Sequence, residues 1–340
     1  MARTKKASVR SISQHCGVST ATVSRVLNND PHVSEKTRQL VLSAAQECGY
    51  ELDFDSLNKN SASKRRKIGI ITPSIGQEYY NNLSKRITEY MEPFGYDVLT
   101  TSFIRKYERL PEVLKTLYSC NVEGIIFISC GYLEVKDFLN PDIPHVWIDC
   151  NDPIESCPDI YTVQSDHFAG GQLAAIELLS KGCKAPLILT SSSDSIRSQQ
   201  RCRGFLQEFE KAGIELDKEE RIKYLPLIKN VFDESRELIR YLIAKEYPFD
   251  SVFAISDWRA LGVYSAIESM NRKVPDDIKI IGFDGISLAC RSVLRITSIQ
   301  KNVKLISQNV CDTLMSLIDG KEPTDKHIII PVDVMIGQSS

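Results

Sequence analysis

A short polar segment near the N-terminus carries the side chains best suited to reading nucleic acid. In the segment STATVSRVLN (residues 19–28), the valines and the leucine follow the three- and four-residue spacing of an amphipathic helix. Thr20, Ala21 and Arg25 then share the opposite side. Because an arginine can donate two hydrogen bonds to one guanine in the DNA major groove, we expect these three residues to contact base edges.

Other short polar side chains nearby are suited to phosphate contacts. Such contacts position a protein on DNA without reading its sequence. The candidates are Ser19, Thr22, Ser24, Asn28 and His32.

Three helices must position these residues. A first helix is predicted from Ser8, and Gly17 permits the left-handed backbone of a tight turn after it. Ser19 is a suitable N-cap for the second helix, and a third helix is predicted from Ser34 until Gly49 stops it. This arrangement is typical of a helix-turn-helix.

The charge distribution supports contact between this region and a polyanion. Residues 1–67 contain twelve Lys and Arg against six Asp and Glu, whereas the remaining residues carry a net charge of −8. A basic head on an acidic body is expected when only the head meets DNA.

The rest of the chain alternates short apolar strands with longer helical stretches. Strands are predicted at 68–72, 96–102, 124–129, 145–149, 161–166, 186–191, 221–227, 251–256 and 279–284. Helices are predicted near 79–94, 108–119, 167–181, 198–212, 233–246 and 259–272. The fold class is therefore α/β, with an all-α head followed by two doubly wound lobes of parallel sheet and a cleft between them.

Ligands of open parallel sheets bind beyond the carboxyl ends of the strands. The residues found there are small, hydroxylic, acidic or aromatic, which suits a sugar or another polyol. They are Ser74, Tyr79, Tyr80, Ser129, Asp149, Asp166, Ser191, Ser192, Ser193, Ser256, Asp257 and Asp284.

Several classes of protein are disfavoured. No apolar run is long enough to span a membrane and the N-terminus is polar, so we expect a cytoplasmic protein without membrane contact. The ten cysteines form no CxxC pair and the five histidines form no ligand-spaced cluster, so neither a metal nor a cofactor is expected. Nucleotide-binding and hydrolase motifs are also missing, so we expect no catalytic residues.

The residues of the head resemble those of the lactose-repressor/galactose-repressor (LacI/GalR) family of transcriptional regulators. The resemblance lies in GVSTATVSRVLNN and VSEKTRQLVLSAAQECGY and continues through VEGIIFIS, FAISDWRALG and VPDDIKIIGFDG. It implies that Thr20, Ala21 and Arg25 read bases and that the body resembles type I periplasmic sugar-binding proteins.

The resemblance also assigns effector contacts in the cleft. It makes Arg201, in the R-x-x-G-F motif, and Asp284 the main polar contacts of the effector. It places Tyr79 and Tyr80 in the first lobe, with Asp149 and Asp166 as further candidates. Ser256 stands where the family has an asparagine, and Pro226, Leu227 or Phe232 is expected in the place of the family's stacking aromatic.

The expected domains are a helix-turn-helix head (1–50), an atypical hinge (51–67) and an effector-binding domain (68–340). Lobe 1 is predicted at about 68–163 plus 293–322, and lobe 2 at about 164–292 plus 323–340. In the hinge, Leu52 replaces the family's proline and Lys59 replaces the leucine that wedges a base step open. How the hinge acts on DNA is therefore open.

The sequence predicts a homodimeric regulator of transcription, a repressor, that binds near-palindromic operator DNA. A small-molecule effector, a sugar or sugar derivative, is expected in the cleft. The alternatives are an architectural DNA-binding protein that ignores ligands, a solute-binding protein and an enzyme.

Overall fold

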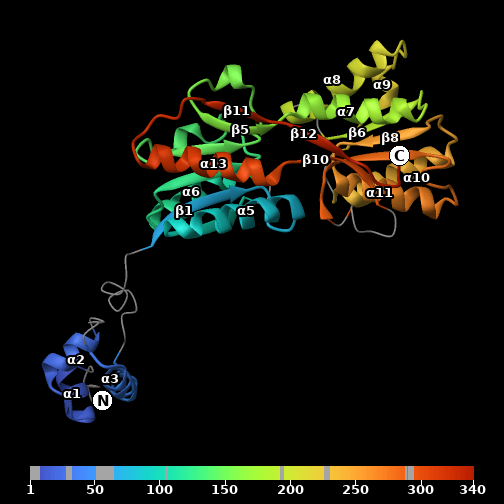
Figure 1. Ribbon diagram of the computed structural model, residues 1–340. Helices are drawn as coiled ribbons and strands as arrows, with labels where there is room; N and C mark the ends of the chain where they lie inside the picture. The colour runs from blue at the N-terminus through green and yellow to red at the C-terminus, as the bar shows by residue number, and fades with distance from the viewer. Residues whose placement is uncertain are drawn as a thin grey trace. The chain divides into compact units, whose positions relative to one another are not determined.

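The computed structural model describes residues 8–27, 33–50, 65–103, 106–191, 195–225, 230–287, 289 and 295–340. The chain divides into two compact units, Met1–Arg65 and Arg66–Ser340, which are called the head and the body below. Figure 1 shows the helical head and the two α/β lobes of the body. The predicted hinge residues 51–64 lie outside the described residues.

The head contains helices α1 (Val9–Cys16), α2 (Thr20–Leu27) and α3 (Glu35–Glu47). Gly17 takes a left-handed conformation (φ 70°) between α1 and α2, as predicted. The Ser34 side chain caps α3 by accepting a hydrogen bond from the backbone N–H of Thr37, at 3.3 Å. The helix-turn-helix prediction is therefore confirmed in its turn and its caps.

A small apolar core holds the three helices together. Its buried residues come from all three: Ile12, Val23, Val26, Leu27, Val41, Ala44 and Ala45. Their three- and four-residue spacing leaves the opposite face of each helix to the solvent.

The body contains two six-stranded sheets. The first has the order β11-β5-β4-β3-β1-β2 and the second has the order β12-β10-β9-β8-β6-β7. The strands of the first sheet are β1 (Arg66–Thr72), β2 (Tyr96–Ser102), β3 (Gly124–Ile128), β4 (His145–Ile148), β5 (Tyr161–Ser165) and β11 (His327–Ile330). Those of the second are β6 (Pro186–Thr190), β7 (Ile222–Tyr224), β8 (Ser251–Ala254), β9 (Lys279–Asp284), β10 (Thr297–Lys301) and β12 (Val332–Met335).

Among the described residues, every strand pair is parallel except that of β12 with its neighbour β10. The central strands are continuous apolar runs because helices cover both faces of each sheet. Ile68, Ile70 and Ile71 of β1, for example, are fully buried. The prediction of two doubly wound lobes is confirmed.

The main helices of the body are α5 (Glu78–Met91), α6 (Leu110–Ser119), α7 (His167–Ser180), α8 (Ile196–Lys211), α9 (Lys218–Arg221), α10 (Val231–Ala244), α11 (Asp257–Ser269) and α13 (Val303–Ile318). Helix α13 packs against α5 and the first sheet, and α7 packs against α8 in the second lobe. None of the described helices is both long and apolar enough to cross a membrane.

The C-terminal strands depart from the predicted lobe ranges. Strand β10 was expected in the first lobe but pairs with β9 in the second, and β11 was expected in the second lobe but pairs with β5 in the first. The chain therefore crosses between the sheets after β5, after β10 and after β11 (Figure 1). Sequence order does not reveal these crossings because hydrogen-bond partners decide which sheet a strand joins.

Candidate DNA-reading face and ligand cleft

Helix α2 presents the predicted base-reading residues to solvent. Thr20, Ala21 and Arg25 are exposed, whereas Val23 and Val26 on the other side are fully buried. An exposed guanidinium on a short amphipathic helix can reach the edge of a base.

The predicted phosphate contacts are only partly described. The Ser19 hydroxyl lies 2.9 Å from the Thr22 hydroxyl and accepts the Thr22 backbone N–H at 3.2 Å, so both residues lie at the N-terminus of α2. Ser24 is half-buried on the same helix. Asn28 and His32 lie outside the described residues.

A cavity of about 550 Å³ lies at the carboxyl ends of the strands of both sheets. This volume suits a small-molecule ligand. The side chains that line it and bear on function are Tyr79, Tyr80, Tyr107, Ser129, Glu134, Ser191, Arg197, Arg201, Ser256, Trp258, Arg259, Asp284 and Lys301.

Three residues at these strand ends have left-handed backbone conformations. Ser129 follows β3 with φ 53°, Asp149 follows β4 with φ 49°, and Asp284 ends β9 with φ 115°. Non-glycine residues in this region are strained and cluster at functional sites, because the surrounding structure must hold them there.

Asp149 is the centre of a buried polar network. Lys301, at the end of β10, donates to Asp149 Oδ2 at 3.0 Å, and the Tyr79 hydroxyl donates to the same oxygen at 3.1 Å. The backbone N–H of Ser165 donates to Asp149 Oδ1 at 2.8 Å, and His167 Nε2 lies 3.2 Å from Oδ1. Since Lys301 belongs to the second sheet and Asp149 to the first lobe, this ion pair joins the lobes.

The network shifts the pKa of its members in opposite directions. Burial alone would raise the pKa of Asp149, but the charge of Lys301 and the hydrogen bond with His167 hold it well below its usual range. Burial lowers the pKa of His167 to about 3, so its imidazole is neutral at pH 7. Burial also raises the pKa of Tyr79, and the negative charge of Asp149 adds to that effect.

Arg201 is held from several directions on α8. Its guanidinium donates to His167 Nδ1 at 3.2 Å and to the backbone carbonyl of Ile255, and it lies 3.9 Å from Asp284. Asp284 also lies 3.3 Å from Lys301. Two glycines permit this geometry, because a Cβ at Gly171 of α7 or at Gly204 of α8 would overlap the backbone of the facing helix.

The cavity brings together five of the seven predicted effector contacts: Tyr79, Tyr80, Arg201, Ser256 and Asp284. The other two do not line it. Asp149 is fully buried behind the wall, where its charge stabilises Lys301 and Tyr79. The Asp166 carboxylate instead caps α7, accepting the Ala169 N–H at 2.8 Å.

Arg197, Trp258 and Lys301 line the cavity but were not predicted. Arg197 follows the same strand as Ser191, and Trp258 follows the same strand as Ser256, each by a few residues more. The expectation that ligands bind beyond the carboxyl ends of strands could therefore have included both residues. Lys301 required the strand at 297–301, which was not among the predicted strands.

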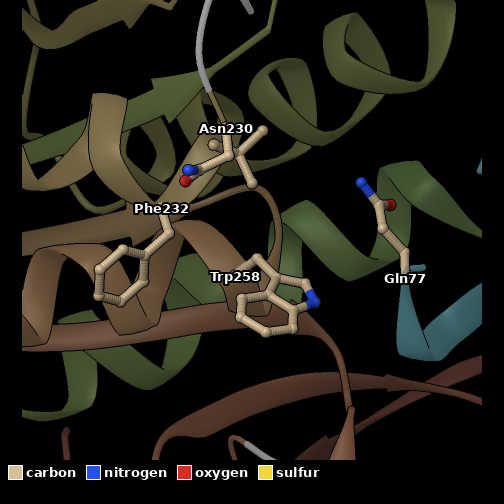
Figure 2. Close-up of a pocket in the computed structure, with 5 residues that line it drawn as sticks. Gln77, Asn230, Phe232 and Trp258 are labelled. Atoms are coloured by element: carbon tan, nitrogen blue, oxygen red, sulfur yellow. The ribbon is translucent and has the colours of Figure 1, made fainter.

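A second cavity of about 430 Å³ (Figure 2) shares Gln77, Val231 and Trp258 with the lining of the first. Gln77 faces Phe232 and Trp258 across it, and Asn230 and Val231 complete its lining. Phe232 was one of three residues predicted in the place of the family's stacking aromatic; the other two, Pro226 and Leu227, lie outside the described residues. The flat faces of Phe232 and Trp258 can pack against the C–H surface of a ring.

Both the head and the body are similar to known protein families. A model of bacterial regulatory proteins of the lacI family matches residues 9–52, and a model of a periplasmic binding protein-like domain matches residues 175–340. The ribose operon repressor of Halalkalibacterium halodurans is 27% identical over 339 residues, with 98% of this chain and 96% of the relative covered. The sucrose operon repressor of Streptococcus mutans is 29% identical over 336 residues, with 98% and 99% covered.

A solved structure shows the same fold over nearly the whole chain. The lac repressor dimer bound to operator and the anti-inducer ONPF matches with a TM-score of 0.71 at 20% identity, and the match covers 98% of this chain and 99% of that chain. The two family models match regions that the structure shows as a helix-turn-helix head and as part of a two-lobed body. The chain combines a region of the lacI family of bacterial regulatory proteins, at residues 9–52, with a periplasmic binding protein-like domain, at residues 175–340.

Proposed function

We propose that this chain is a transcriptional repressor whose affinity for operator DNA is controlled by a sugar or sugar derivative bound in the cleft. The observation that carries this proposal is the 550 Å³ cavity walled by residues of both lobes. A ligand that contacts both walls favours one arrangement of the lobes, and a regulator needs such a preference. No cofactor is part of the proposal.

The chemistry of the wall supports a hydroxylated ligand. The carboxylate of Asp284 and the guanidinium of Arg201 can hydrogen-bond hydroxyl groups, and Tyr79, Tyr80 and Trp258 offer aromatic surface. Two similar proteins are named ribose operon repressor and sucrose operon repressor, which also favours a sugar as the ligand.

The head supports the DNA-binding half of the proposal. One head can read only a few base pairs, so specificity requires two heads on a near-palindromic site and hence a homodimer. Thr20, Ala21 and Arg25 would read bases, and Ser19, Thr22 and Ser24 would contact phosphates. Residues 1–50 would form the DNA-binding domain and residues 51–67 the linker.

The test begins with duplexes selected from a random library by the full-length protein. Arg25→Ala should lower affinity for the selected site by about 1–3 kcal/mol per head, because a bidentate base contact is lost. Its affinity for random DNA should fall less, and ligand binding should not change.

Arg10→Ala is the matched control. Arg10 is an exposed arginine on α1, so its substitution removes the same charge from the same head. Equal losses in the two variants at the selected site would show that α2 does not read sequence.

A further inference from the structure

The described residues of the cleft wall carry more positive than negative charge. Among them, four cationic side chains and two carboxylates line the 550 Å³ cavity: Arg197, Arg201, Arg259 and Lys301 against Glu134 and Asp284. Asp149 adds one negative charge behind the wall. Burial, with the nearby charge of Asp284, raises the pKa of Asp257 to about 8, so this carboxyl is mostly neutral at pH 7.

Two of the cations already face carboxylates of the protein. Lys301 lies 3.0 Å from Asp149 and 3.3 Å from Asp284, and Arg201 lies 3.9 Å from Asp284. Arg259 is almost fully buried and lies 3.4 Å from the Ser191 hydroxyl. The carboxylates thus compensate the buried charges of Lys301 and Arg201 within the protein itself.

Arg197 has a different environment. Its Nη1 donates to the Ser129 hydroxyl at 2.6 Å, while its buried Nε has no hydrogen-bond partner among the described residues. Within the part of the chain that the structure describes, Arg197 forms no ion pair. Glu134 lines the same cavity, but its carboxylate accepts the backbone N–H of Gly131 at 3.3 Å.

The guanidinium of Arg197 therefore has N–H donors that its neutral partner, the Ser129 hydroxyl, does not satisfy. A guanidinium carries five N–H donors in a planar fork that matches the oxygens of a carboxylate or a phosphate. Asp149 behind the wall attracts the charge of Arg197, but no carboxylate of the described residues contacts its guanidinium. Ser195 and Ser198 line the cavity beside Arg197 in the first turn of α8, where the helix dipole also favours an anion.

We propose that the effector is an anion: a polyhydroxylated small molecule whose carboxylate or phosphate group pairs with Arg197. Its hydroxylated part would lie toward Asp284 and Ser256. The aromatic surface of Trp258 and Phe232 (Figure 2) would border that part. This inference rests on the proposed function, because it takes the cleft to be the effector site.

The first experiment measures binding to the full-length protein by calorimetry at fixed ionic strength. The probes are glucose, galactose, the corresponding uronates, the corresponding 6-phosphates and inorganic phosphate. We expect at least one anionic sugar to bind about tenfold or more tightly than its neutral parent. The uronate and phosphate arms show which anionic group the cleft accepts, and inorganic phosphate shows whether the anion suffices without the sugar.

The second experiment tests the role of Arg197. Arg197→Gln should weaken binding of the anionic sugar by about 10- to 100-fold, since a charge-assisted hydrogen bond is lost, and should weaken binding of the neutral parent sugar much less. Arg197→Lys keeps the charge and should retain part of the preference. Arg203→Gln is the control, because Arg203 is an exposed arginine on the same helix.

Two outcomes would overturn the inference: neutral sugars that bind as tightly as the anionic ones, or anionic sugars whose binding is either absent or independent of Arg197.

Operator affinity, measured in parallel, separates this inference from the proposed function. An anion that binds through Arg197 without changing operator affinity would overturn only the proposed function. A neutral sugar that alone changes operator affinity would overturn only the inference.

Discussion

The head and the cleft both present arginine to a ligand, but they hold it in opposite ways. Arg25 is exposed on α2, where water solvates its charge. Arg201 is only 6% exposed and contacts His167, Ile255 and Asp284, which lie far apart in the sequence. The exposed arginine therefore needs only one helix to place it, whereas the buried arginine needs several elements to compensate its charge.

This difference separates two kinds of recognition. DNA brings its own dense negative charge, so the head can bind it with exposed groups that no protein carboxylate neutralises. A small ligand must displace water from a cleft, so its site is built in advance from paired charges. Substitutions in the cleft should therefore affect the stability of the body, whereas exposed residues of α2 should affect DNA binding alone.

The largest effect is expected from Lys301→Met. The substitution leaves the fully buried Asp149 without its ammonium partner, and breaking such a pair lowers the free energy of unfolding by about 3–5 kcal/mol. Urea unfolding would measure the loss. Lys304→Met, at an exposed lysine on α13, should have little effect. The double variant Lys301→Met/Asp149→Asn should be more stable than Lys301→Met; if it is not, the ion pair is not the cause.

The stability of the head should depend on its small apolar core rather than on buried charges. Ile12→Ala leaves a cavity beside Val23 and should destabilise the head by about 2–5 kcal/mol, a large share of the stability of so small a unit. Operator binding should then fall sharply while ligand binding in the cleft persists. Ile176→Ala, at a half-exposed position on α7, serves as the control. A parallel loss of ligand binding would show that the two units do not fold independently.

Acid should weaken the body through His167. Its pKa falls from 6.5 in the unfolded chain to about 3 in the folded protein, so it stabilises the fold above pH 6.5 and this contribution is lost as the pH falls toward 3. Between pH 7.5 and pH 5 the loss is about 2 kcal/mol. Unfolding curves at the two pH values should differ less for His167→Gln than for the wild type. An equal difference would place the acid sensitivity elsewhere.

The same contrast explains what could be predicted from the sequence. The turn at Gly17 and the caps at Ser19 and Ser34 depend on neighbouring residues, so the pattern of the head revealed them. Two doubly wound lobes also followed from alternating strands and helices.

The charge pairs of the cleft could not be predicted in this way. Lys301 reaches Asp149 only because β10 joins the second sheet, and no local pattern indicates that pairing. Asp166 follows a strand as a site residue would, yet it caps a helix, because the same residue types suit both roles.

Operator affinity measured with and without a bound ligand, at one salt concentration, tests the central claim most directly. The ligand is the one that binds the wild-type cleft most tightly in calorimetry. The account predicts that saturating ligand changes the affinity by a factor of about 5–150, and that operator DNA changes ligand affinity by the same factor. Asp284→Ala should abolish this response and preserve DNA binding. A ligand that fills the cleft and leaves operator affinity unchanged would contradict the account.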